Sequence, residues 1–325
     1  HPSNYRDFTS ADNEAHGELW TPVINGEVAM LEVELPDAAA AAELDLKLAK
    51  VNHGFRGWRH PATKIGGTSS GDCNLDVACD ADDGFPMVEL FRDQIRSVGA
   101  YTVEGIDTCT GALINNAAQD NTPYFLTAAH CGINASNAAS VVVYWNFESS
   151  SCREPNTPAS GAVADGDLSQ FNTGSIFRAD DDTSDFCLIE MDDPIDPSFN
   201  LFFSGWSRSS GEASTAVGIH HPGVAEKRIS FEFDPTTTTN GFDPSMVPNG
   251  THVRVVDWDI GTTEPGSSGS PLYDQNGLII GQLHGGPAAC GNDDSDYYGR
   301  VSTSWIGGGT MDSGLRTWLD PFDTG

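Results

Sequence analysis

Three serines lie close together in the stretch TEPGSSGSPLY, residues 263–273, at Ser267, Ser268 and Ser270. Ser268 has a glycine two residues before it and another directly after it. A nucleophile in acyl transfer needs an exposed hydroxyl on a sharp turn, with backbone N–H groups directed at the oxyanion that forms. Because glycine lets the backbone approach that closely, Ser268 is the candidate nucleophile. Polar turns share this composition, so the stretch does not decide the function alone.

A candidate general base stands upstream in FLTAAHC, residues 125–131. An apolar strand-like run ends in two alanines, and His130 and Cys131 follow. The alanines leave room for an imidazole against neighbouring backbone, and a disulfide at Cys131 would fix the loop that holds it. A lone histidine is usually structural, but this setting favours a catalytic base.

A carboxylate must orient that imidazole. The stretch TSDFCLIEM, residues 183–191, places Asp185 directly before an apolar strand. The chain order His130, Asp185, Ser268 is then the order found in chymotrypsin. Four other acids are alternatives, although they do not directly open such a strand: Asp165, Asp167, Asp192 and Asp193.

From Cys73 onward the chain is a series of short β-type runs separated by turns, which is typical of an all-β sandwich or barrel. Near the end, Leu315, Trp318 and Leu319 have the spacing of a short amphipathic helix that stops at Pro321. The runs are CTGALI, YFLTAA, SVVVYW, DFCLIEM, RISFEF, THVRVVDW and LIIGQLHG.

The first 65 residues form a separate segment without cysteine. Residues 29–36 and 43–51 alternate apolar and charged side chains and predict two strands, with the alanines of 38–42 as their connection. Residues 57–72 are rich in Gly, Pro, Ser and Thr and predict a linker. The expected division is therefore a small β-rich segment, 1–65, and a catalytic domain, 66–325.

Charge and composition exclude several functions. The 16 basic and 47 acidic residues give a net charge of −31, which repels nucleic acid and anionic membranes. The chain contains no apolar run of about 18 residues that could span a membrane. The acidic stretch CDADDG, residues 79–84, lacks the rest of an EF-hand loop. We expect no metal, no cofactor and a monomer.

The seven cysteines include no CxxC pair, which argues against zinc. Three disulfides and one free thiol are expected, in a protein secreted from the cell. The alternative is a cytosolic protein with unpaired core cysteines. The sequence begins at His1 without a charged and apolar leader, so we expect that any signal peptide has been removed.

The segments of residues 70–320 resemble, in order, those of bacterial trypsin-like serine proteases, and most closely the lysyl endopeptidases. This resemblance implies two six-stranded antiparallel barrels with a His130–Asp185–Ser268 triad between them, and cleavage after lysine. The matching segments are TGALINN, YFLTAAHCG, VVYWNF, CREPNTPASG, TSDF, HHPGVAEKRIS, TEPGSSGSP, GQLHGGP, SDYYGRV and SWIGGG.

The resemblance also assigns supporting residues. The N–H groups of Gly266 and Ser268 would form the oxyanion hole. Cys187 would remain as a buried, inert thiol. The family's disulfide pairing would be Cys73–Cys290, Cys79–Cys152 and Cys109–Cys131.

The family match for the carboxylate of a lysine pocket is Asp296, while the neighbouring Asp293 and Asp294 are alternatives. Gly285 and Gly286 would leave room for a long side chain, beside His284. A histidine in this region binds acidic side chains in glutamyl endopeptidases, so glutamate is the alternative substrate, although Asp296 would repel it.

Arginine is harder to exclude than glutamate as the substrate residue that enters the pocket. Beyond residue 65 the only lysine is Lys227, against nine arginines, as expected of a protease that cuts after lysine or of a salt-adapted composition. The chain departs from the family in having no tryptophan in 236–250.

Activation is the last expectation. Lys64 stands where mature family enzymes begin, so residues 1–65 are expected to be a pro-region cut there, or else a retained accessory segment. Ser267 occupies the position where trypsin-type zymogens carry the aspartate that pairs with a new N-terminus, so ordering by Ile65 is not expected. The alternatives to an active protease are a precursor blocked by residues 1–65 and a non-catalytic binding module.

Overall fold

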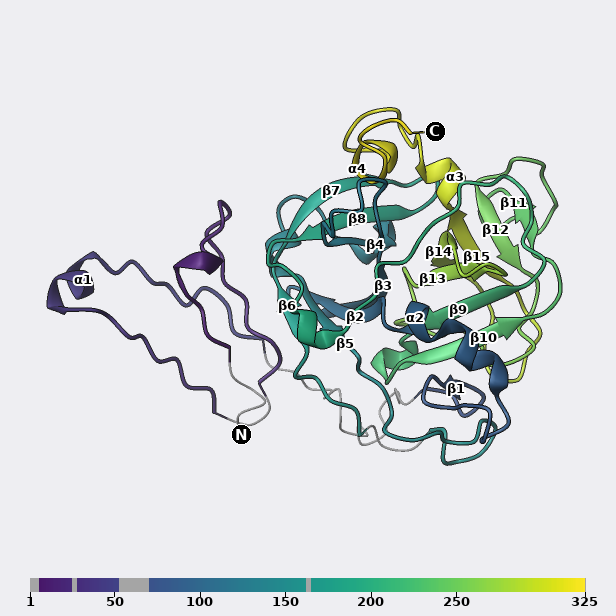
Figure 1. The fold of residues 1–325 in the computed structure, drawn as a ribbon, viewed down its shortest axis with the longest axis horizontal. Helices are drawn as coiled ribbons and strands as arrows, with labels where there is room; N and C mark the ends of the chain where they lie inside the picture. Colours follow the sequence, from purple (N-terminus) through teal and green to yellow (C-terminus); the bar gives the residue numbers. More distant parts are fainter. Residues whose placement is uncertain (1–5, 25–27, 53–69, 162–164, 325) are drawn as a thin grey trace.

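The computed structural model describes residues 6–24, 28–52, 70–161 and 165–324. From residue 70 onward the chain folds into two curled antiparallel sheets, which fill the right of Figure 1. The expected all-β class is confirmed, although the sheets hold seven and eight strands rather than six each. Short edge strands such as the two-residue β1 account for part of the difference.

The seven-stranded sheet has the order β6-β5-β2-β3-β4-β8-β7. Its strands are β2 (Val98–Val103), β3 (Asp107–Leu113), β4 (Tyr124–Ala128), β5 (Val142–Trp145), β6 (Phe171–Thr173), β7 (Ser175–Asp181) and β8 (Phe186–Met191).

The eight-stranded sheet has the order β1-β10-β9-β13-β14-β15-β12-β11. Its strands are β1 (Leu75–Asp76), β9 (Ala216–His220), β10 (Arg228–Glu232), β11 (Thr237–Thr239), β12 (His252–Val255), β13 (Pro271–Asp274), β14 (Ile279–Gly285) and β15 (Asp296–Arg300). The helices are α1 (Ala38–Glu43), α2 (Arg92–Ile95), α3 (Val301–Ser304) and α4 (Arg316–Leu319).

Buried aromatic side chains from three strands of the seven-stranded sheet pack together. The ring of Phe125 lies 5.7 Å from that of Tyr101 and 5.7 Å from that of Trp145, both edge to face. All three side chains are fully buried. Such contacts add to area burial and keep β2, β4 and β5 in one rigid barrel wall.

The structure contains the three disulfides that the resemblance implied: Cys73–Cys290, Cys79–Cys152 and Cys109–Cys131. Cys187 is the free cysteine of the described residues and is buried in β8, which raises the pKa of its thiol. The Cys109–Cys131 bond fixes the residue next to His130 to β3.

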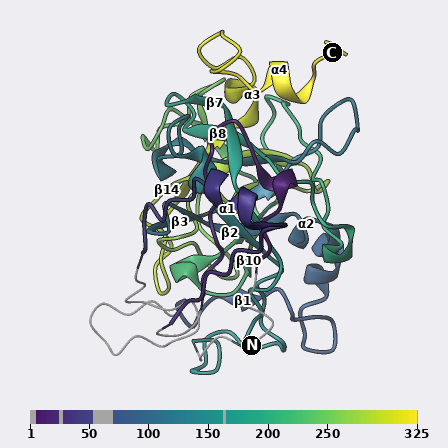
Figure 2. The same cartoon turned by 90° about the vertical axis from the view of Figure 1, so that its left-hand side faces the viewer.

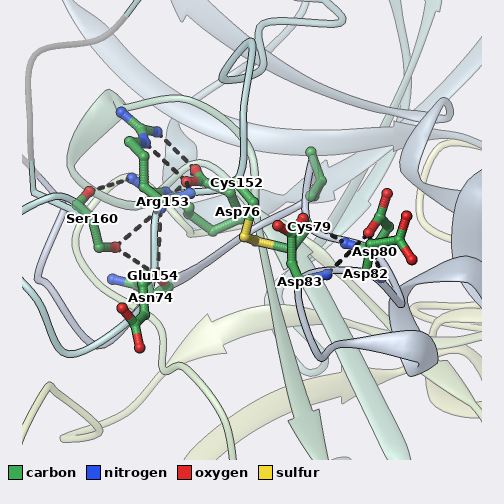
Figure 3. The surroundings of a disulfide bond; sticks show 12 residues. Asn74, Asp76, Cys79, Asp80, Asp82, Asp83, Cys152, Arg153, Glu154 and Ser160 are labelled. Atoms are coloured by element: carbon green, nitrogen blue, oxygen red, sulfur yellow. Dashed lines mark hydrogen bonds and ion pairs between the residues drawn. A yellow bond between two sulfur atoms is a disulfide. The ribbon is translucent and has the colours of Figure 1, made fainter.

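Figure 3 shows a buried ion pair beside the Cys79–Cys152 disulfide. Arg153 donates from Nε and Nη2 to the two oxygens of Asp76, at 2.8 and 2.7 Å. This bidentate pair holds β1, where Asp76 lies, against the segment that carries Cys152. In the neighbouring acidic turn, Asp80 accepts the N–H groups of Asp82 and Asp83, so this carboxylate closes its own turn.

The prediction of two strands in the N-terminal segment is wrong. Among the described residues, 28–35 and 44–52 have no regular secondary structure and no partner strand, and Met30 and Val51 are 86% and 76% exposed. The alanine run instead forms α1, because alanine has the highest helix propensity and Asp37 caps the first turn through Ala39 N and Ala40 N.

The N-terminal segment lies outside the seven-stranded sheet, and α1 is at its far tip (Figure 1). In the turned view the segment crosses in front of the sheets (Figure 2). Arg6 pairs with Asp193 at 2.8 Å, His16 contacts Asp192 at 3.2 Å, and Val23 N donates to the Tyr144 hydroxyl at 2.8 Å.

The expected boundary near residue 65 and the cleavage site Lys64 lie outside the described residues. The C-terminal helix is confirmed as α4, and Leu315 and Leu319 are buried as its spacing predicts. Among the described residues, no helix combines the length and apolar character needed to cross a bilayer.

Candidate active site

His130 and Asp185 are brought together by the pairing of two strands. β4 ends at Ala128 and β8 begins at Phe186, and these two residues are register partners. His130 lies in the short helical turn that follows β4, and Asp185 directly precedes β8. The Ala129 N–H donates to the Asp185 carbonyl at 2.9 Å, which ties the two loops together.

Asp185 holds His130 at two points. Its Oδ2 lies 2.7 Å from His130 Nδ1, and its Oδ1 accepts the His130 backbone N–H at 2.8 Å. Asp185 is 3% exposed. Because an ionised carboxylate only accepts, Nδ1 carries the proton and the lone pair of Nε2 is free to act as a base.

The loop of Ser268 packs against the same strand end. The Ser268 carbonyl accepts the Thr110 N–H at 2.9 Å. A Cβ at Gly269 would collide with Thr127 Oγ1 and would lie 2.8 Å from Ala128 N, so only glycine fits. No hydrogen bond joins the described side chains of Ser268 and His130, a bond that is often long before substrate binds.

The turn before Ser268 exposes two backbone donors. Gly266 has φ +100°, and a Cβ there would lie 3.0 Å from the His221 carbonyl and 3.0 Å from Val224 N. Within the described chain, the N–H groups of Gly266 and Ser268 donate to no other group. Two free donors beside a serine hydroxyl are what an oxyanion hole requires.

Comparison with known families decides the relationship. A family model described as the lysyl endopeptidase C-terminal domain matches residues 67–299, and one described as the lysyl endopeptidase N-terminal domain matches residues 3–55. The chain belongs to the lysyl endopeptidase family. The predicted resemblance to trypsin-like lysyl endopeptidases is thus confirmed.

A curated relative, the lysyl endopeptidase of Pseudomonas aeruginosa, is 26% identical over 302 residues. The match covers 90% of this chain and 62% of the relative, so the chain spans less than two thirds of that protein's length. The match therefore includes most of this lysyl endopeptidase homologue, whereas part of the relative lies outside it.

Solved structures are more distant. A Glu endopeptidase in complex with MPD has a TM-score of 0.42 at 16% identity, over 65% of this chain and 87% of that chain. Human heparin binding protein has a TM-score of 0.44 at 14% identity, over 70% of this chain and 92% of that chain. Likenesses of this degree carry no information about substrate.

The lysyl endopeptidase homologue has one buried carboxylate where the pocket was expected. Asp296 begins β15 and is fully buried, whereas Asp293 and Asp294 are exposed. Trp258 Nε1 and Thr263 Oγ1 both donate to Asp296 Oδ2, each at 2.8 Å. Oδ1 has no partner among the described residues, and burial raises the pKa of the carboxyl.

Gly286 packs closely against that unpartnered oxygen, where a side chain would not fit. A Cβ at Gly286 would lie 2.5 Å from Asp296 Oδ1 and would collide with the Ser295 carbonyl. Gly285, next to it, has φ +147° and lies against Phe242. The two glycines therefore place no side chain over Asp296 Oδ1.

His284 lies between the pocket and the His130–Asp185 pair. It is the extra residue of a β-bulge in β14, where Leu283 faces Tyr298 and Gly285 faces Tyr297, and a bulge re-aims a side chain. Its ring stacks on His130 at 5.6 Å, and its Nε2 is 3.8 Å from Asp185 Oδ2.

Four contributors to the site were not identified from the sequence: Trp258, Thr263, His252 and Phe242. Phe242 comes from the segment that lacks the family's tryptophan, and its ring lies 4.6 Å from that of His284. The sequence signal that could have identified Phe242 was an aromatic residue within 236–250, because phenylalanine can cover an imidazole as tryptophan does.

Proposed function

We propose that the protein is a secreted serine endopeptidase in which His130, Asp185 and Ser268 form the catalytic triad. The observation that carries the proposal is the contact of 2.7 Å between His130 Nδ1 and the buried Asp185, beside the GSSGS loop. This contact leaves the unprotonated Nε2 as the base, which is the arrangement that a serine nucleophile requires.

The reaction follows from that arrangement. Ser268 Oγ attacks the substrate carbonyl while His130 Nε2 takes its proton, and the N–H groups of Gly266 and Ser268 stabilise the oxyanion. His130 then gives the proton to the leaving amine, and the acyl group remains on Ser268. Water attacks the ester by the reverse sequence, which releases the carboxylate product and restores the hydroxyl.

Lysine is the proposed residue before the cleaved bond. A buried carboxylate with one unpartnered oxygen favours a cationic substrate group, because leaving that oxygen without a partner is costly. The same carboxylate disfavours the alternative substrate, glutamate, although His284 is close by.

The partners of Asp296 favour lysine over arginine. Trp258 and Thr263 already donate to Oδ2, so only Oδ1 is left without a partner. One free oxygen suits the compact ammonium of lysine, whereas the guanidinium of arginine pairs best with both carboxylate oxygens. The proposed partners are thus protein and peptide substrates with exposed lysines, and no nucleic acid or membrane.

Residues 1–65 are proposed to be a pro-region that is removed by cleavage at Lys64. Lys47 and Lys50, within the segment, are exposed. Lys227, in the catalytic part, is fully buried, with its Nζ 2.7 Å from Glu148 Oε1 and 2.8 Å from the Ile95 carbonyl. A lysine-specific enzyme would thus spare its own catalytic part and cut the segment.

Two measurements test the proposal. A serine-directed organophosphonate should label Ser268 in processed protein and fail to label the Ser268→Ala variant. A folded, processed protein without label would instead be a non-catalytic binding module. Mass spectrometry of a mixed protein digest should give new C-termini at lysine, and termini mainly at glutamate would refute the proposed pocket.

A further inference from the structure

A second histidine, His252, contacts His284 and has no role in the proposed reaction. His252 begins β12, which pairs with β15, and β15 pairs on its other side with β14. The His252 and His284 rings are 5.1 Å apart, and Nε2 of His252 lies 2.9 Å from Nδ1 of His284. The intervening strand residue opposite His252 is Gly299.

The partners of His252 fix where its proton lies. The Gly241 backbone N–H donates to both His252 Nδ1 and Thr251 Oγ1, each at 3.2 Å, and Thr251 Oγ1 lies 2.8 Å from the same Nδ1. A backbone N–H can only donate, so Nδ1 is an acceptor and the neutral ring carries its proton on Nε2. That proton is donated to His284 Nδ1, which leaves the proton of a neutral His284 on Nε2, facing Asp185.

We propose that His252 is a positioning residue that keeps His284 neutral, with its proton on Nε2 and its N–H dipole directed at Asp185. The inference deepens the proposed serine endopeptidase function and rests on it. His284 then stabilises the carboxylate that orients His130, and its ring supports the face of the His130 imidazole. His252, which lies behind the stacked rings of His130 and His284, thus sets the tautomer of His284.

The environment of both rings keeps them uncharged. Burial lowers the pKa of His252 to about 4, and burial also lowers the pKa of His284. The titratable groups that face His284 are Asp185, His130 and His252, of which Asp185 alone favours a cation. Without the His252 donor, His284 Nδ1 could take a proton, and that charge would oppose the imidazolium that His130 forms during catalysis.

A matched pair of variants tests the donor. In His252→Gln the amide nitrogen can reach the position of Nε2 and donate to His284, whereas His252→Asn reaches only the position of Nδ1. With a lysyl amide substrate, we expect His252→Asn to lose between about tenfold and about 100-fold in kcat with little change in KM. On the acid side of the pH profile, kcat of His252→Asn should fall with the uptake of two protons instead of one. His252→Gln should resemble the wild type.

Imidazole 15N spectra give a readout that is independent of activity. In Ser268→Ala protein at neutral pH, His284 should be neutral with the proton on Nε2. A proton on Nδ1 or a cationic ring there would overturn the inference without any change at His252. Equal kinetics of the Asn variant and the wild type would also overturn it, whereas a wild type without lysyl activity would refute the proposed function instead.

Discussion

Ser267 directly precedes the proposed nucleophile, and its hydroxyl lies 2.8 Å from Nδ1 of His220. Both residues are fully buried. Ser230 donates to the Thr262 carbonyl at 3.0 Å, so it accepts from His220 Nε2, and Nδ1 must accept from Ser267. Burial lowers the pKa of His220 to about 3, so this chain of hydrogen bonds stays neutral.

Ser267 stands where trypsin-type zymogens carry the aspartate that pairs with a new N-terminus after activation, and its partner here is the neutral His220. Replacing Ser267 with alanine leaves His220 Nδ1 and the Glu264 N–H without their partner, so we expect a loss of about 1–3 kcal/mol of stability. We also expect a lower kcat, because the same turn carries the proposed oxyanion donors. Denaturant unfolding and steady-state kinetics measure both effects.

An Ile65→Gly variant provides the contrast. Because no carboxylate stands at residue 267 to receive a new N-terminal amine, processed Ile65→Gly protein should keep the wild-type kcat. Loss of activity in a correctly processed Ile65→Gly protein would show that the N-terminus does order the site.

Asp296 should determine the preference for lysine. In Asp296→Asn the amide oxygen can still accept from Trp258 and Thr263, so the fold is kept while the charge is lost. Removing one partner of a buried charge pair costs about 3–5 kcal/mol, so kcat/KM for a lysyl substrate should fall by at least about 100-fold. Its exposed neighbour provides the control, because Asp294→Asn should leave kcat/KM unchanged.

The proposed triad could be found from the sequence because each member stands beside a local signal. His130 follows a strand and two alanines, Asp185 opens a strand, and Ser268 lies between glycines. Their partners were not found, because they meet through strand pairing. Trp258 is 38 positions from Asp296 in the chain and reaches it because β12 pairs with β15, where Val255 faces Asp296.

The N-terminal segment shows the opposite limit. Alternation in residues 29–36 and 43–51 is typical of a half-buried strand, but a strand also needs a neighbour for its backbone groups. The described part of the segment offers none, and apolar side chains such as Val28 stay 82% exposed. Periodicity cannot reveal whether a partner strand exists.

The attachment of the N-terminal segment should depend on pH through Asp192. Burial raises the pKa of Asp192 to about 6, with His16 opposing the shift and Asp193 and Glu14 adding to it. The part of this burial that the N-terminal segment supplies makes the pKa higher in the bound state than after dissociation. It therefore stabilises the bound state at low pH, and this contribution is lost as the pH rises through about 6. After cleavage at Lys64, the segment should therefore dissociate more readily at pH 7.5 than at pH 5.

Size-exclusion chromatography of the cleaved protein at the two pH values measures this dissociation. The Asp192→Asn variant should remove most of the difference, because an amide does not ionise. Asp167→Asn, at an exposed carboxylate, is the control and should behave as the wild type. A pH dependence that persists in Asp192→Asn would assign it to another group, such as His16.

Discrimination between lysine and arginine should depend on the donors to Asp296 Oδ2. Trp258→Phe removes one of them, so that a guanidinium can pair with both oxygens. Since a hydrogen bond to a charged group contributes about 1.5–3 kcal/mol, the lysine-to-arginine ratio of kcat/KM should fall by about tenfold or more. Trp258→Phe also creates space, so Thr263→Val, which removes the other donor without enlarging the pocket, is the matched variant. A lower ratio in both variants would support control by the donors, whereas a lower ratio in Trp258→Phe alone would assign the discrimination to pocket size.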